Sequence, residues 1–266
     1  MTTALYRRDG EHFVPSELTR GPWRPDAQHG GPPSALLVRA IARHEDGERM
    51  FITRLTVELL RPIPLAPVTV STTFERPGKR VQLVRASLAV DGVEVARATA
   101  LRMRRAQLTL PKLPATAMAP PHHSQGRPRT DDMFRYDDLP SFAYDGVDHR
   151  IVAGGFDIPG PATDWMRLRQ PLVEGEPTSP LCRAVAAADF GNGLSSALPP
   201  SEGYSFINPD LTVYFHREPV GEWICLAAES HLSPIGVGVA ESRLWDEAGA
   251  FGRSLQSLLV AHEPTR

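Results

Sequence analysis

Apolar residues at helical spacing predict a first helix that begins near residue 32. One face of this segment carries Ser34, Leu37, Val38 and Ile41, while the arginines between them lie on other faces. Gly30, Gly31 and Pro32 precede the stripe, and proline suits the first turn of a helix. Four strand-like runs follow at about 51–61, 67–75, 80–90 and 93–104, with Pro-Gly and Asp-Gly dipeptides at the last two turns.

The same order of elements is expected again in the second half. Ser179 and Pro180 open a second helix that runs through Asp189. The following strands are predicted at about 206–216, 222–231, 236–246 and 250–261. Strand-like material also precedes each helix, near 4–14 and near 148–170. Each half therefore reads as a strand, a helix and four antiparallel strands, which is an α+β layer arrangement.

Residue identities indicate that the two halves are copies of one unit. Leu55-Thr56-Val57 recurs as Leu211-Thr212-Val213, an offset of 211 − 55 = 156 positions. The same offset pairs Leu88 with Leu244 and Arg97 with Arg253. One offset kept over about 45 residues is the sign of a duplicated structural unit. Where one copy is apolar and the other is polar, the polar group is not required by the fold.

A proline-rich stretch separates the two copies. Its prolines, which exclude a regular strand or helix, are Pro111, Pro114, Pro120, Pro121 and Pro128. We therefore expect an N-terminal unit over 1–105, a linker over 106–130 and a C-terminal unit over 131–266. His122 and His123 lie in this linker without further ligands at a metal-binding spacing, so a solvated linker without metal is expected there.

Composition and motifs restrict the class of protein. With 266 residues, 41% hydrophobic and 23% charged, and a net charge of −2, the chain is typical of a soluble globular protein. This charge argues against nucleic acid or a membrane surface as the main partner. No apolar run could span a membrane and the N-terminus lacks a secretory signal, so a cytoplasmic protein is expected. Serine-hydrolase elbows and glycine-rich nucleotide motifs are also missing from the sequence.

The two cysteines, Cys182 and Cys225, both lie among apolar residues. Two cysteines make neither a disulfide framework nor a metal site, so we expect buried, reduced thiols.

Three polar residues of the second copy occur where the fold does not require them. Asp189 lies on the apolar stripe of the second helix, where a carboxylate needs a partner, or else it caps the frayed helix end. Gln256 stands where the first copy has Ala100, on a sheet face that packs against a helix or at an edge that faces water. Asn208 stands where the first copy has Ile52, with turn chemistry as its alternative role.

A further candidate is the segment that enters the first helix. His29 precedes Gly30 and Gly31, and a helix N-terminus offers free backbone N–H groups that suit a carbonyl oxygen or an anion. These three residues are candidates to touch a substrate. The alternative for His29 is a loop residue packed under the sheet.

These features resemble the TesB-type acyl-CoA thioesterases, also called acyl-CoA thioesterase II. The matching segments are His-Gly-Gly at 29–31, Ala-Ala-Asp-Phe at 187–190, Asp-Leu-Thr-Val-Tyr-Phe-His-Arg at 210–217, and the late Gln256. The resemblance implies two fused hotdog folds, each a long helix wrapped by a curled antiparallel sheet. It also implies a catalytic Asp, Thr and Gln, of which Asp189 and Gln256 match by context. Asn208 stands where that family has Thr.

The activity implied by the resemblance is hydrolysis of a fatty acyl-CoA to free acid and CoA, without metal, cofactor or covalent intermediate. Asp189 would orient or deprotonate a water that Gln256 and Asn208 fix by hydrogen bonds. The Gly30–Gly31 helix start would polarise the carbonyl across the interface between the halves. The acyl chain would lie between the two helices and sheets.

Two other functions remain open at this point. Hotdog hydratases and dehydratases place an Asp and a His on one short segment, whereas no His follows Asp189. A binding protein for acyl-CoA or another acyl ligand, without catalysis, is the second alternative. Exposed sheet edges and hotdog kinship lead us to expect a homodimer or a larger homo-oligomer.

Overall fold

The computed structural model describes residues 4–45, 47–111, 118–133, 135–136, 139–199 and 202–262. The first half begins with a hairpin of β1 (Tyr6–Asp9) and β2 (His12–Pro15), followed by the 3-10 turn η1 (Glu17–Thr19). Helix α1 (Gly31–Arg43) comes next, and a second 3-10 turn, η2 (Gly47–Arg49), follows it. The remaining strands are β3 (Met50–Leu59), β4 (Val68–Arg76), β5 (Val81–Val90) and β6 (Val93–Arg104).

The second half repeats this order. The turns η3 (His123–Gln125) and η4 (Phe142–Gly146) lead to a hairpin of β7 (Val147–Gly155) and β8 (Ile158–Leu168). Helix α2 (Pro180–Ala188) and the short α3 (Gly191–Leu194) follow. The last strands are β9 (Tyr204–Ile207), β10 (Asp210–Phe215), β11 (Ile224–Ser233), β12 (Val237–Asp246) and β13 (Gly249–His262). The predicted order is found, except that a hairpin rather than a single strand precedes each helix.

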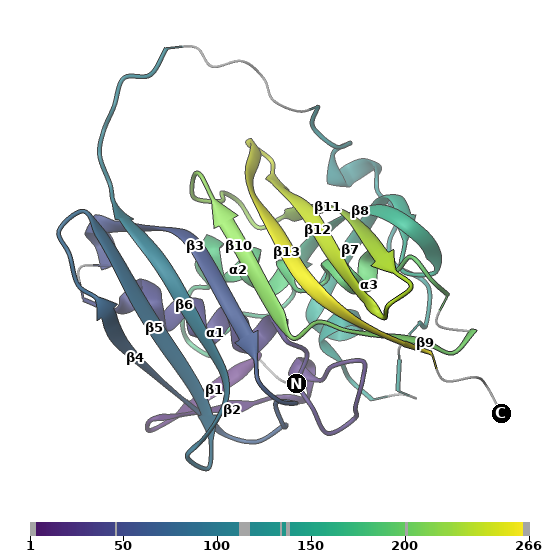
Figure 1. The fold of residues 1–266 in the computed structure, drawn as a ribbon, viewed down its shortest axis with the longest axis horizontal. Coiled ribbons are helices and arrows are strands. Elements are labelled where there is room, and N and C mark those ends of the chain that lie inside the picture. The colour runs from purple at the N-terminus through teal and green to yellow at the C-terminus, as the bar shows by residue number, and fades with distance from the viewer. Residues whose placement is uncertain are drawn as a thin grey trace.

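The strands of both halves form one antiparallel sheet (Figure 1). Its order in the described part of the chain is β1-β2-β4-β5-β6-β3-β10-β13-β12-β11-β8-β7, and β9 adds to β13. The halves join where β3 pairs with β10, and there Thr56 lies opposite Thr212. The Thr212 hydroxyl lies 3.2 Å from the Thr56 hydroxyl. Because these residues are equivalent in the two copies, an approximate two-fold axis passes between them.

Helices α1 and α2 lie side by side on one face of this sheet, which curls around them (Figure 1). A single apolar core contains both helices, with Leu37 and Ile41 from α1, Val185 from α2, and Leu55 and Val213 from the joining strands. The predicted α+β arrangement is therefore confirmed. In the part of the chain that the structure describes, no helix combines the length and the apolar character needed to cross a membrane.

Two predicted elements end differently from our expectation. The strand predicted at 206–216 is interrupted at Asn208 and Pro209, because proline has no N–H for a sheet. As a result β9 pairs with the distal end of β13, and β10 pairs with its middle. The second helix ends at Ala188, and Asp189 is its C-cap residue. Both cysteines are free and buried, as expected.

The described end of the predicted linker contacts the C-terminal half but stays largely exposed. Residues 112–117 of that linker lie outside the described residues. Arg127 and Ile151 exchange two backbone hydrogen bonds of 3.0 and 2.8 Å. The Trp165 indole donates to the carbonyl of Pro121 at 2.8 Å. Because Pro121, His122 and Arg127 are nevertheless exposed, the expected solvated stretch agrees with the structure here, while the boundaries at 105 and 131 remain a prediction.

Candidate active site

The N-terminus of α1 meets the C-terminus of α2 at a pair of glycines. Gly30 is the N-cap residue of α1, and Gly31 is its first residue. A Cβ atom on Gly30 would lie 2.8 Å from Oδ2 of Asp189. A Cβ atom on Gly31 would lie 2.6 Å from the carbonyl oxygen of Ala186 in α2. Glycine is needed at both positions because only the missing side chains let the two helix ends approach.

Asp189 is buried at this junction and accepts hydrogen bonds from two amide side chains. Its side chain is only 5% exposed. Asn208 donates from Nδ2 to Oδ1 at 3.0 Å, and Gln256 donates from Nε2 to the same oxygen at 3.3 Å. On the other side, Nδ1 of His29 lies 2.9 Å from Oδ2. The structure thus brings together Asp189, Asn208 and Gln256 of the second copy with His29 of the first.

Gln256 hydrogen-bonds to Asp189 without reaching the cavity. Its Nε2 also donates to the backbone carbonyl of Asp189 at 3.2 Å, and its Oε1 accepts from the backbone N–H of Asn192 at 2.9 Å. The Gln256 side chain is 2% exposed and does not line the cavity described below. Its amide is engaged with protein groups at both ends. This geometry suits a residue that orients the carboxylate.

His29 packs against two aromatic rings that also stack on each other. Its ring centroid lies 5.2 Å from that of Phe142 and 4.6 Å from that of Phe190. Gly31 donates its backbone N–H to Nδ1 at 3.0 Å. Nδ1 also lies 2.9 Å from Oδ2 of Asp189, so it can donate to that carboxylate when it carries a proton and accept from the Gly31 N–H when it does not. Asp189 and the Gly31 N–H therefore compete for the same ring nitrogen.

Asp189 faces a cavity of about 470 Å³ that both copies line. Much of its wall is apolar, from Leu59 and Ile63 of the first copy to Phe156, Phe190 and Ile207 of the second. His29, Gly30 and Asn208 also line it, whereas Gly31 does not. A mostly apolar cavity with a few polar groups at one point is typical of a small-molecule site.

Three arginines also line the cavity, and two of them are engaged. Arg129 pairs with Asp131 at 2.8 Å and stacks on Phe156, with 3.8 Å between its guanidinium carbon and the ring centroid. Burial acts to raise the pKa of the Asp131 carboxyl, but the Arg129 hydrogen bond and charge outweigh it and hold that pKa below its ordinary value. Arg24 pairs with Asp26 at 2.7 Å. Within the described residues, Arg61 is exposed and has no ion-pair partner.

A buried ion pair supports the aromatic wall from behind. Nδ1 of His149 lies 2.5 Å from Oδ2 of Asp164, and Nε2 lies 2.9 Å from the carbonyl oxygen of Ala143. Both ring nitrogens of His149 therefore contact protein oxygen atoms. Its ring packs edge-on against Phe156 and Phe190, which line the cavity.

Sequence reasoning missed this ion pair and the role of Asn192. His149 and Asp164 lie on the paired strands β7 and β8, whose register shifts between Ile151 and Ala153. No simple spacing therefore connects the two residues. The contribution of Asn192 is a backbone N–H, which no side-chain pattern reveals.

Two family models match the chain. One describes the acyl-CoA thioesterase N-terminal domain and matches residues 19–103, and the other describes the acyl-CoA thioesterase C-terminal domain and matches residues 115–260. No curated protein matches the sequence at a significant level.

Solved structures from other organisms share the fold along nearly the whole chain. The tesB protein of Mycobacterium avium subsp. paratuberculosis is 16% identical, with a TM-score of 0.67 and coverage of 96% of this chain and 94% of that one. The acyl-CoA thioesterase II TesB2 of Mycobacterium marinum is 20% identical, with a TM-score of 0.64 and coverage of 88% and 89%. A conserved hotdog-fold protein of Alicyclobacillus acidocaldarius is 18% identical, with a TM-score of 0.71 and coverage of 96% and 95%. These likenesses establish a double hotdog fold.

Proposed function

We propose that this chain, which belongs to the acyl-CoA thioesterase family, hydrolyses an acyl-CoA thioester to a free acid and CoA with a water activated at Asp189. The observation that carries the proposal is the buried Asp189 carboxylate at the wall of an apolar cavity. Two amide donors and an imidazole fix its orientation. An apolar cavity suits an acyl chain, and a fixed carboxylate suits the activation of one water.

The reaction needs a proton acceptor, an oxyanion donor and a leaving group. Asp189 accepts a proton from water as the water oxygen bonds to the thioester carbon. The tetrahedral oxyanion then collapses, the C–S bond breaks, and Asp189 returns the proton to the sulfur of CoA. Asn208 keeps one oxygen of Asp189 occupied, so that Oδ2 is the oxygen shared between His29 and the water.

The roles of the two amides differ from our first expectation. Gln256 was expected to grip the water, but its amide already bonds to Asp189 and to the Asn192 N–H. We therefore assign Gln256 to positioning the carboxylate. Asn208, which lines the cavity, is the amide that stands next to the substrate in this proposal.

A single backbone N–H is proposed as the oxyanion donor. Residues 32 and 33 of α1 are prolines and have no N–H, and Gly31 donates to His29. Gly30 lines the cavity, and its N–H has no acceptor among the described residues. An N–H at a helix N-terminus stabilises negative charge, which suits the oxyanion of the tetrahedral intermediate.

The proposal is tested by release of free thiol from a panel of acyl-CoA esters of increasing chain length. Asp189→Asn keeps the size of the side chain and should lower kcat by at least about 100-fold, since general-base catalysis contributes about 10²–10⁴-fold. Glu229→Gln, an exposed carboxylate on β11, is the matched control and should turn over like the parent chain. Tight acyl-CoA binding without turnover by the parent chain would instead identify a binding protein.

A hydratase remains the second candidate because His29 and Asp189 are 2.9 Å apart. The paired His and Asp that such enzymes use arises here from two different segments. The panel should therefore include a 2-enoyl-CoA, with hydration followed as loss of the enoyl absorbance. We expect thiol release and no hydration. Hydration that depends on both residues would overturn the thioesterase assignment.

A further inference from the structure

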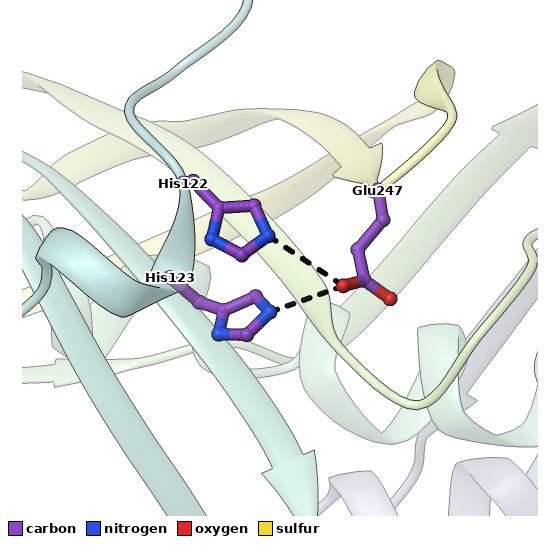
Figure 2. Close-up of side chains that lie close together, drawn as sticks. All are labelled: His122, His123 and Glu247. Atoms are coloured by element: carbon purple, nitrogen blue, oxygen red, sulfur yellow. Dashed lines mark hydrogen bonds and ion pairs between the residues drawn. The ribbon is translucent and has the colours of Figure 1, made fainter.

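Two histidines and a glutamate converge on the surface of the C-terminal half, and none of them lines the cavity. Figure 2 shows the rings of His122 and His123 with their Nε2 atoms directed at the carboxylate of Glu247. The two Nε2 atoms lie 3.6 and 3.1 Å from the same oxygen, Oε1. Glu247 is 124 residues from His123 in the chain, in the turn between β12 and β13.

The spacing of these three atoms fits one small divalent ion. Zn²⁺ binds imidazole nitrogens and carboxylate oxygens at about 2.0–2.2 Å in a tetrahedron, so neighbouring ligand atoms stand about 3.4 Å apart. The measured distances of 3.1 and 3.6 Å lie on either side of that value. The ligand atoms of all three residues lie within 4.8 Å of one another. An ion would therefore fit after small movements of the side chains.

The histidines are held in place by two tryptophans. The ring of His123 stacks on Trp223 with 4.7 Å between centroids and an interplanar angle of 14°. It also packs edge-on against Trp165 at 5.8 Å. The Trp165 indole binds the carbonyl of Pro121, the residue before His122, at 2.8 Å. These contacts fix the turn that carries both rings, so little ordering is left for an ion to impose.

Glu247 lies in a hairpin turn that is held in place by the contacts of the residue before it. The neighbouring Asp246 side chain is fully buried and forms two hydrogen bonds of 2.6 Å with Arg217. It also accepts the backbone N–H of Ala248 at 2.8 Å. The turn is therefore fixed, and the Glu247 carboxylate, which is 44% exposed, remains open to an ion from solvent.

A group behind His122 can set the tautomer that metal binding requires. Nδ1 of His122 lies 2.9 Å from the hydroxyl of Ser124, which can accept a hydrogen bond from Nδ1 when that atom is protonated. A proton on Nδ1 leaves a lone pair on Nε2 for the metal, and such outer hydrogen bonds orient metal-binding histidines. The longer contact from the Ser124 backbone N–H, at 3.2 Å, is lost in that tautomer.

We propose that His122, His123 and Glu247 bind one Zn²⁺ ion, with water as the fourth ligand. Two imidazoles and one carboxylate suit Zn²⁺ and similar transition ions, whereas Mg²⁺ and Ca²⁺ prefer oxygen ligands alone. The ion joins the segment that precedes the C-terminal unit to the β12–β13 turn. It thereby stabilises the folded chain by binding it and not the unfolded one.

The test is calorimetric titration of the EDTA-treated chain with zinc chloride, using protein without a histidine tag. The parent chain should bind one ion. His122→Ala and Glu247→Gln should each weaken binding at least about tenfold, since losing even an outer group costs about 10- to 100-fold. His231→Ala is the matched control, because His231 lies in a second surface cluster with Glu229 and Glu241 and should leave binding unchanged.

A second measurement locates the ion. Co²⁺ bound at this cluster lies next to Trp223 and Trp165 and should quench tryptophan fluorescence, and Zn²⁺ should reverse the quenching by competition. Zinc should also raise the melting temperature of the parent chain but not of Glu247→Gln, whose circular dichroism should match the parent. The proposal is overturned if the parent chain binds no zinc, if His122→Ala binds as tightly as the parent, or if binding follows His231.

Discussion

Gln256→Leu should disturb the orientation of the Asp189 carboxylate while leaving the residues that line the cavity unchanged. Leucine has a similar size but no polar atoms, so the backbone N–H of Asn192 and the carbonyl of Asp189 each lose a partner at 2.9 and 3.2 Å. Leaving a buried polar group without a partner costs about 1–3 kcal/mol. The free energy of unfolding should therefore fall by about that amount for each group, and the protein should remain folded at room temperature.

The kinetic effect of the same change should fall on kcat. The carboxylate of Asp189 also loses the donor at 3.3 Å, and a displacement of about 1 Å in a catalytic group can cost about 100-fold. Because Gln256 does not line the cavity, KM should change little. Steady-state thiol release gives both constants, and urea unfolding gives the stability.

A companion variant sharpens this test. Gln256→Glu keeps an acceptor for the Asn192 N–H but places a second carboxylate beside Asp189. Two adjacent carboxylates share a proton, so activity should move to higher pH while stability is better preserved than in Gln256→Leu. A Gln256→Leu protein with a raised KM and an unchanged kcat would show that this amide touches the substrate. The positioning role would then be refuted.

Three further outcomes follow from the same geometry. Gly30→Ala would place a Cβ atom 2.8 Å from the proposed catalytic carboxylate, so thiol release should be lost while circular dichroism is unchanged. Asp164→Asn weakens the buried contact with His149, and urea unfolding should show a loss of about 3–5 kcal/mol. Burial acts to raise the pKa of Asp246, but hydrogen bonds from an arginine and two backbone N–H groups hold it below its ordinary value. Its stabilising contribution is present above the ordinary carboxyl range and lost as the pH falls from about 5 toward 1, so Asp246→Asn should flatten the acid branch of the stability curve.

The fold could be predicted largely because the two copies repeat the same local signals. Gly31 and Pro180 begin the two helices at or next to the predicted starts, and the turn dipeptides fix the hairpins. Comparing the copies also identified Asn208 and Gln256 as polar residues at positions that are apolar in the first copy. The structure brings both within hydrogen-bond distance of Asp189.

The sequence did not reveal which distant segments of the chain come into contact. The pairing of His29 with Asp189 depends on how α1 and α2 pack, and no local spacing encodes that. The approach of Glu247 to His123 depends on where the end of the linker lies on the C-terminal half. The sequence showed no sign of a metal site at His122 and His123 because their third neighbour is on a remote hairpin.

The approximate two-fold axis also shows why chemistry is expected at one helix junction and not at its counterpart. At the equivalent end of α1, Arg102 is fully buried and donates to the carbonyls of Ile41, His44 and Glu45. The offset of 156 places Leu258 at the corresponding position of the second copy. An arginine that caps the free carbonyls of a helix end stabilises that end. The Gln82 amide bonds to this guanidinium, and Ile52 and Ala100 stand where the second copy has Asn208 and Gln256. The duplication thus lets one junction stabilise the fold, which leaves the other free to bury the carboxylate to which we assign the activation of water.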